Sequence, residues 1–241
     1  MNHYITLICC LGVVSLPLLR GQTVAPEKPD IAARRAWVVA TTLPKDLPNP
    51  LPFMSGETLH QVRMHLRSVG QAVPVDKTGL VRAVQEETDA DGNILYKNLS
   101  LSQIPEGVRE ALIVLVPNAE GSDGLRFRSK VIDLSKFKKG GCLYVNLVPT
   151  KLGITIGESK TVISPGGMEF INPLGNKESG VFPVAFFYEI PKEDGAEWKL
   201  MTSSKMAIYK SRREICIFYY NNEIENVDFR GIPFMTPEPR P

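Results

Sequence analysis

Residues 182–190 read FPVAFFYEI, and their alternation decides the fold class. Every second residue from Phe182 to Ile190 is apolar, so these side chains share one face of an extended strand. Glu189 falls on the opposite face, where polar residues of a half-buried strand meet water. The stretch therefore predicts a β-strand that covers a core with one side only.

In two further stretches, the distribution of apolar residues also predicts which faces of a strand are covered. Residues 111–116, ALIVLV, are apolar on both faces, which predicts a central strand that is covered on both sides. In residues 125–131, LRFRSKV, apolar and basic residues alternate, which predicts a half-buried strand with a basic outer edge. The basic face consists of Arg126, Arg128 and Lys130.

Short segments rich in Val, Ile, Phe and Tyr recur along the chain, separated by Gly, Pro, Asn or Asp. This spacing predicts an all-β fold, an antiparallel β-sandwich of the immunoglobulin-like or a related type. We expect one unit over residues 34–232, with a subdivision near residues 139–141 into two stacked sandwich halves as an open alternative. Short helical turns are expected at residues 105–110 and 135–139, and residues 233–241 are expected to form a disordered, Pro-rich tail.

Two segments interrupt the strand pattern. Residues 44–52, PKDLPNPLP, contain four prolines, so we expect a stiff connection and no helix or central strand there. Residues 55–70, SGETLHQVRMHLRSVG, fit both an amphipathic helix and an alternating strand, and the strand is the preferred interpretation.

The N-terminus carries the longest uncharged apolar run, residues 4–19. It is short for a membrane-spanning helix, and Pro17 interrupts its end, so a signal peptide over residues 1–21 fits better than an uncleaved anchor. A Pro-rich leader, residues 22–33, would follow. We expect an extracytoplasmic protein, periplasmic or secreted, that has no membrane span once the signal is cleaved.

The charge and cysteine content exclude several classes of function. The 241 residues carry a formal net charge of +2 without a basic cluster, so no nucleic-acid partner is expected. Two of the four cysteines lie in the signal segment, which leaves Cys142 and Cys216 in the mature chain. They form either one disulfide or two buried thiols, and ligands for a zinc site are lacking.

The residues that usually perform catalysis are sparse. His60 and His65 would lie about 17 Å apart on a strand or be rotated by about 140° on a helix, so they cannot share a metal. Residues 88–93, TDADGN, fit a hairpin turn better than a calcium loop. No nucleotide-binding motif is present, so we expect no metal and no cofactor.

Binding surfaces are the remaining option. Trp198, Tyr219 and Tyr220 offer aromatic faces, although the two tyrosines point in opposite directions on a strand. Arg126, Arg128 and Lys130 offer a basic patch, or simply a solvated edge. We expect an exported, non-catalytic structural, assembly or binding component of the cell envelope or extracellular space. Its partner would be an envelope protein or an anionic polysaccharide; the alternative is a carboxylate-dependent hydrolase of an extracytoplasmic polysaccharide.

Overall fold

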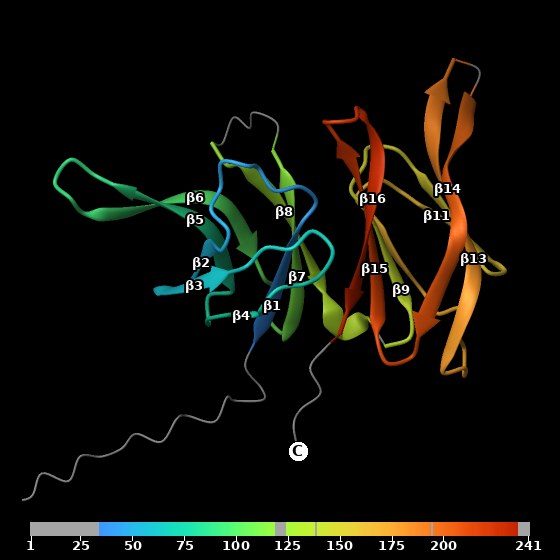
Figure 1. Cartoon of the computed structure of the whole chain (residues 1–241), viewed down its shortest axis with the longest axis horizontal. Coiled ribbons are helices and arrows are strands. Elements are labelled where there is room, and N and C mark those ends of the chain that lie inside the picture. The colour runs from blue at the N-terminus through green and yellow to red at the C-terminus, as the bar shows by residue number, and fades with distance from the viewer. Residues whose placement is uncertain (1–33, 119–123, 138, 194, 236–241) are drawn as a thin grey trace, which may run out of the picture. The chain divides into compact units, whose positions relative to one another are not determined.

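The computed structural model describes residues 34–118, 124–137, 139–193 and 195–235, and these residues fold almost entirely into β-strands (Figure 1). The first half of the fold contains β1 (Arg35–Ala40), β2 (Leu51–Ser55), β3 (Thr58–Val62), β4 (Val73–Pro74), β5 (Leu80–Thr88), β6 (Ile94–Gln103), β7 (Glu110–Pro117) and β8 (Phe127–Asp133). The second half contains β9 (Cys142–Asn146), β10 (Leu152–Ile156), β11 (Ser159–Ile163), β12 (Met168–Ile171), β13 (Ser179–Lys192), β14 (Gly195–Tyr209), β15 (Arg213–Asn221) and β16 (Asn226–Phe234). A 3-10 turn, η1 (Leu134–Lys136), lies between the halves.

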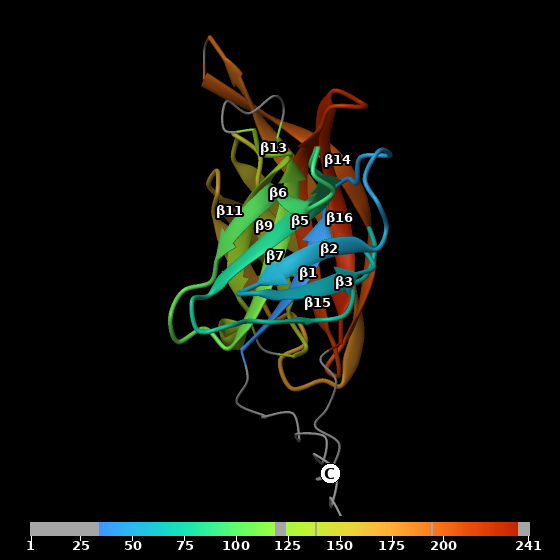
Figure 2. The ribbon, with the colours of Figure 1, turned by 90° about the vertical axis from the view of Figure 1, so that its left-hand side faces the viewer.

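Each half consists of two four-stranded sheets. Sheet A has the order β4-β1-β7-β8 and sheet B the order β3-β2-β5-β6, whereas sheet C is β12-β9-β15-β16 and sheet D is β11-β10-β13-β14. Figure 2 looks onto sheet B, with the remaining sheets behind it. The expectation of an all-β sandwich is confirmed. It missed the parallel pairing of β1 with β7 and of β9 with β15, which joins strands far apart in the chain.

The two halves repeat one topology strand for strand. Strand β9 pairs with β12 and β15 as β1 pairs with β4 and β7. Likewise, β10 pairs with β11 and β13 as β2 pairs with β3 and β5. The register places Leu51 opposite Val62 and Leu152 opposite Ile163, so Leu51 and Leu152 are equivalent. Both hairpins then turn at a glycine of positive φ, Gly56 (φ 59°) and Gly157 (φ 58°), a conformation that glycine adopts without strain.

The long hairpins β5–β6 and β13–β14 are equivalent as well. Their registers shift at the same place, between Ala83 and Val84 in one and between Phe186 and Phe187 in the other. Counting from these bulges, Lys97 corresponds to Lys199 and Tyr96 corresponds to Trp198. The halves can therefore be compared residue by residue, although few side chains are shared.

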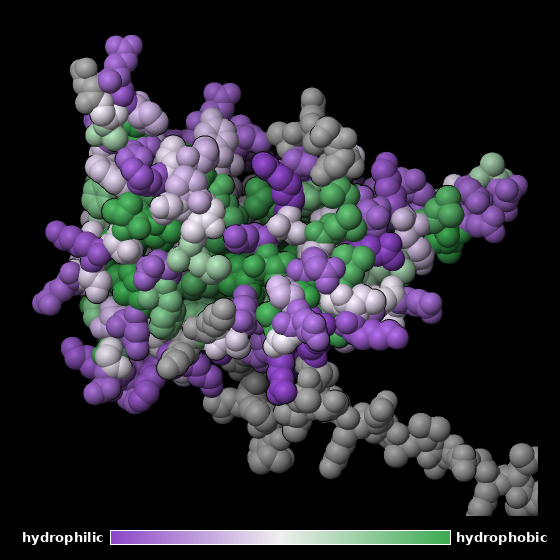
Figure 3. All heavy atoms as spheres, turned by 180° about the vertical axis from the view of Figure 1, so that it is seen from behind, coloured by the Kyte–Doolittle hydropathy of each residue, from purple (hydrophilic) through white to green (hydrophobic). Residues whose placement is uncertain are grey.

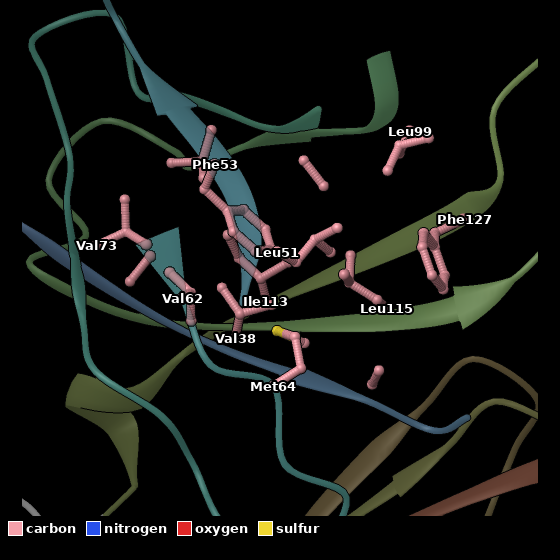
Figure 4. Packing of buried hydrophobic residues seen from close by; sticks show 14 of the residues in the cluster. Val38, Leu51, Phe53, Val62, Met64, Val73, Leu99, Ile113, Leu115 and Phe127 are labelled. Carbon is pink, nitrogen blue, oxygen red and sulfur yellow. The ribbon is translucent and has the colours of Figure 1, made fainter. Parts of the chain in front are cut away.

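Three apolar clusters hold the sheets together. One lies between sheets A and B, where Leu51 and Phe53 of β2 pack against Val38 and Ile113 (Figure 4). A second fills the space between sheets C and D, and a third joins the inner sheets A and C. Strand β7 contributes alternate residues to the first and third clusters, which confirms that it is covered on both faces. The predicted inner face of β13 is confirmed in the second cluster.

Aromatic and charged residues connect the two halves. Trp37 of β1 meets Phe234 of β16 edge to face, with ring centroids 5.1 Å apart. Glu110 and Arg213, which occupy equivalent positions on β7 and β15, lie 4.0 Å apart, and Glu110 also binds Arg35 at 2.8 Å. Strand β16 ends at Phe234, which is fully buried, so the folded unit extends two residues beyond its predicted end at residue 232. The predicted start of the tail at residue 233 is therefore wrong.

The structure agrees only in part with the expectations for the two segments that interrupt the strand pattern. Residues 55–70 form strand β3 only as far as Val62, and the following residues have no regular structure. Pro52 lies within β2, contrary to expectation, although β2 is flanked by two strands. The strand accommodates it because pairing with β5 starts only at Phe53. Residues 105–110 form no helix, while η1 occupies part of residues 135–139.

Candidate functional site

The outer face of sheet D carries an apolar row of side chains. Phe186 of β13 points into the second core, so its neighbour Phe187 points outward. The register aligns Phe187 with Gly153 of β10 on one side and with Leu200 of β14 on the other, and Gly153 in turn pairs with Val162 of β11. The row therefore crosses all four strands of the sheet.

Trp198 turns this row into a hollow. A methyl group added at Gly153 would lie 3.3 Å from Trp198 Cζ3 and 3.4 Å from Phe187 Cβ, so the missing side chain gives the indole room to lie against the sheet. The hollow is a depression of about 430 Å³ that is open to solvent, and Trp198 is 42% exposed. Its lining consists of Gly153, Ile154, Thr155, Lys160, Thr161, Val162, Phe187 and Trp198.

Polar groups lie at the margin of this Trp198 hollow. Two threonines and Lys160 belong to its lining and supply hydroxyl and ammonium groups. Next to it, Glu189 is the strand partner of Trp198 and binds Lys151 with a nitrogen–oxygen distance of 3.1 Å. An aromatic floor with a few polar groups at its edge is the usual composition of a small-ligand site. Such a site suits a flat ligand that has an apolar face and hydroxyl groups around its rim.

The equivalent place in the first half differs. Pro52 stands where the second half has Gly153, and Gln61 stands in place of Val162. A hollow of about 310 Å³ is present there, lined by Pro48, Pro50, Pro52, Gln61, Gln85 and Glu86, and no aromatic ring belongs to its lining. The hollow at the equivalent place in the first half therefore lacks the aromatic lining of the Trp198 hollow.

The two tyrosines of β15 point to opposite faces of the strand, as their adjacent positions predict. Tyr219 is buried and donates a hydrogen bond to Asp228 Oδ2 at 3.0 Å; burial, with Asp228 nearby, raises its pKa to about 12. Tyr220 is 49% exposed and lines a different depression of about 290 Å³, together with Tyr188 and Pro191. Neither tyrosine belongs to the lining of the Trp198 hollow.

The basic residues do not form a free cluster. Arg126 donates two hydrogen bonds to the carboxylate of Asp46, at 3.0 and 2.9 Å, and this interaction holds the pKa of Asp46 below its usual value. Lys130 donates to the carbonyl oxygen of Gly166 at 3.3 Å, whereas Arg128 is exposed. These residues lie at or beside β8 in sheet A, so the structure does not bring them together with Trp198 in sheet D.

The candidates for catalysis stay apart as well. His60 lies on β3, and His65 is exposed in the segment that follows. Glu214, which the sequence did not single out, is a buried carboxylate whose pKa is raised by burial and which is ion-paired with Arg212. In the parts of the chain that the structure describes, no group of three or more His, Cys, Asp or Glu side chains could hold a metal ion.

Cys142 and Cys216 are both buried and both free, so the possible disulfide is not formed. They lie on adjacent parallel strands, but Cys142 pairs with Glu214 and Cys216 with Tyr144, two positions out of register. Strand spacing and rise then separate their Cα atoms by about 8 Å, beyond the roughly 7 Å limit for bridging. The Cys142 thiol instead donates to the sulfur of Met206, at 3.8 Å.

Both thiols are therefore expected to stay reduced and unreactive in the folded protein. Burial raises the pKa of Cys142 to about 12 and also raises that of Cys216, so almost no thiolate, the reactive form, exists at pH 8. A chain starting at residue 22 should react with a thiol reagent at both cysteines once it is denatured without reductant, and at neither when native. Absence of reactive thiols after denaturation would show that a bridge forms.

Comparisons with known proteins add no identity: no protein-family model matches the chain, and no curated protein is significantly similar to it. Among the described residues, no helix has the length and hydropathy required to cross a bilayer. The expected signal peptide, residues 1–21, and the leader, residues 22–33, lie outside the described residues.

Proposed function

We propose that the protein is an exported, non-catalytic β-sandwich protein that binds a polysaccharide of the cell envelope or extracellular space through the Trp198 hollow. The observation that carries the proposal is the indole of Trp198, which lies against Gly153 beside Phe187 and is still 42% exposed. Exposing a large aromatic face on a rigid sheet is unfavourable in water unless a ligand covers it.

A sugar ring matches the composition of this hollow. Its axial C–H face is apolar and stacks on an aromatic ring, while its hydroxyl groups seek donors and acceptors at the edge. The threonines and Lys160 can provide these contacts, and the ammonium group also favours a sugar that bears a carboxylate or sulfate. The proposed ligand is therefore an anionic polysaccharide.

The absence of catalysis is part of the proposal. A glycoside hydrolase needs two carboxyl groups that face each other across the scissile bond. Among the described residues, the strand partner of Trp198, Glu189, is held by Lys151, and the buried Glu214 is held by Arg212. Export rests on the apolar run at residues 4–19.

Affinity electrophoresis in gels that contain acidic polysaccharides, such as alginate or polygalacturonate, tests the proposal. Trp198→Ala is expected to weaken retardation about tenfold, since stacking on an aromatic ring contributes about 1–1.5 kcal/mol. Tyr220→Ala is the matched control, because it removes an equally exposed ring outside the hollow. Equal loss in both variants, or release of reducing sugar during the run, would refute the proposal.

A further inference from the structure

The edge strands of the two outer sheets differ, although they are equivalent in topology. In the first half, β6 borders sheet B and lies against β8 of sheet A, with Ser129 Oγ donating a hydrogen bond to the carbonyl oxygen of Leu101 at 2.7 Å. This contact closes the sandwich along one side. In the second half, β14 borders sheet D (Figure 1), and no comparable contact joins β14 to β16 in the described strands.

The residue-by-residue equivalence gives a reason for this difference. Leu101 corresponds to Ser203 and Ser129 corresponds to Phe229, as their registers with β5, β13, β7 and β15 show. Phe229 has no hydroxyl to bind the edge strand. Its ring instead packs on Phe186 and Phe218, with centroids 5.1 and 5.8 Å away. The second sandwich therefore lacks the bond that fastens the edge strand of the first.

Apolar residues line the unfastened side. Met201 and Met206 of β14 and Val227 and Phe229 of β16 pack on the second core but are only partly buried. The border of β14 also leaves the outward backbone N–H and C=O groups of its middle part without a neighbouring strand. Towards its end, the carbonyl oxygen of Ala207 already accepts a hydrogen bond from Arg212 Nη2 at 3.3 Å. An edge strand with free backbone groups is a template for a further strand, and apolar side chains of such a strand could cover the partly buried residues.

The charge of β14 indicates which strand would fit. From Trp198 to Tyr209 the only charged residues are Lys199 and Lys205, and no acidic residue occurs. Two copies of β14 side by side would bring like charges together, which disfavours pairing with a second copy of this chain. An acidic partner strand would instead be attracted.

We propose that β14 accepts an extended, acidic segment of a partner protein with apolar residues at alternate positions, which adds to sheet D as a fifth strand and covers the apolar residues between β14 and β16. The part of β14 beyond the bulge and before Ala207, residues 202–206, is paired with β13 on its other side and offers the template. This interface is separate from the Trp198 hollow, so the inference does not depend on the proposed function.

A synthetic peptide tests the inference with the chain from residue 22 onward. The probe has about eight residues, with valine and threonine alternating between aspartates at both ends, and a second peptide carries lysine in place of aspartate. Amide hydrogen exchange and calorimetry are the readouts. We expect the acidic peptide to slow exchange in β14, and Lys205→Glu to weaken its binding about fivefold while favouring the basic peptide.

Lys77→Glu, an equal change of charge at an exposed residue of the first half, is the control and should leave both affinities unchanged. Protection confined to β6, or equal effects of the two variants, would overturn the inference. A concentration-dependent dimer in sedimentation that protects β14 without peptide would also overturn it, because the occupant would then be a second copy. Loss of polysaccharide binding in Trp198→Ala with normal peptide binding separates this interface from the hollow.

Discussion

Replacing Phe186 by alanine is expected to lower the free energy of unfolding by about 3–5 kcal/mol. Phe186 is 1% exposed and forms the centre of an aromatic group in the second core. Its ring meets those of Phe218 and Phe229 edge to face, each at 5.1 Å, and that of Tyr144 at 5.9 Å. Truncation removes these contacts and leaves a cavity that rigid sheets C and D cannot close. Urea denaturation followed by circular dichroism measures the loss.

The neighbouring Phe187 is the matched control for this experiment. It is the same residue type on the same strand, but it points outward and lines the Trp198 hollow. Phe187→Ala should cost about 1 kcal/mol or less and should weaken polysaccharide binding, whereas Phe186→Ala should act on stability. Similar destabilisation by both variants would mean that the assignment of the two faces of β13 is wrong.

Trp37→Ala is expected to cause a loss of similar size, about 3–5 kcal/mol, at a different place. Trp37 belongs to the cluster that joins sheets A and C, where its ring contacts Phe234 at 5.1 Å and lies under the guanidinium of Arg35 at 5.3 Å. The indole is 4% exposed, so its removal leaves a cavity between the two halves. Thermal unfolding followed by calorimetry measures the change.

Trp198→Ala is the control for this second variant, because it removes the other tryptophan of the chain from an exposed position. We expect it to change the free energy of unfolding by about 1 kcal/mol or less. If Trp37→Ala were equally mild, the cluster between sheets A and C would not hold the halves together. Trp37 thus reports on the core between the halves, and Trp198 reports on the hollow.

Local periodicity predicted much of the fold. The alternation in residues 182–190 gave the buried face of β13, and the uniform apolar run in residues 111–116 gave the central position of β7. Both patterns reflect which faces of a strand are covered. Residues that are close in sequence are enough to show this, because successive side chains point to opposite faces. Trp198 is among the predicted binding residues because its ring offers an aromatic face.

Long-range pairing could not be predicted in this way. The repeat of the two halves is not visible in the sequence, because equivalent strands share burial and turns more than residues. Val38 and Tyr144, for example, face the two outer cores at equivalent positions. Gly153 and Phe187 were missed as site residues. Phe187 carried a usable signal, since it shares the outward face with Glu189, but the role of Gly153 depends on three strands brought together by folding.

Tryptophan fluorescence distinguishes ligand binding in the Trp198 hollow from binding elsewhere on the protein. The chain has two tryptophans, Trp37 at 4% and Trp198 at 42% exposure, so the red-shifted emission that iodide quenches belongs to Trp198. Titration with a soluble acidic polysaccharide should shift that emission to the blue and protect it from iodide, and Trp198→Phe should abolish the response. Binding of the polysaccharide with the emission of Trp198 unchanged would show that the ligand does not bind in the Trp198 hollow.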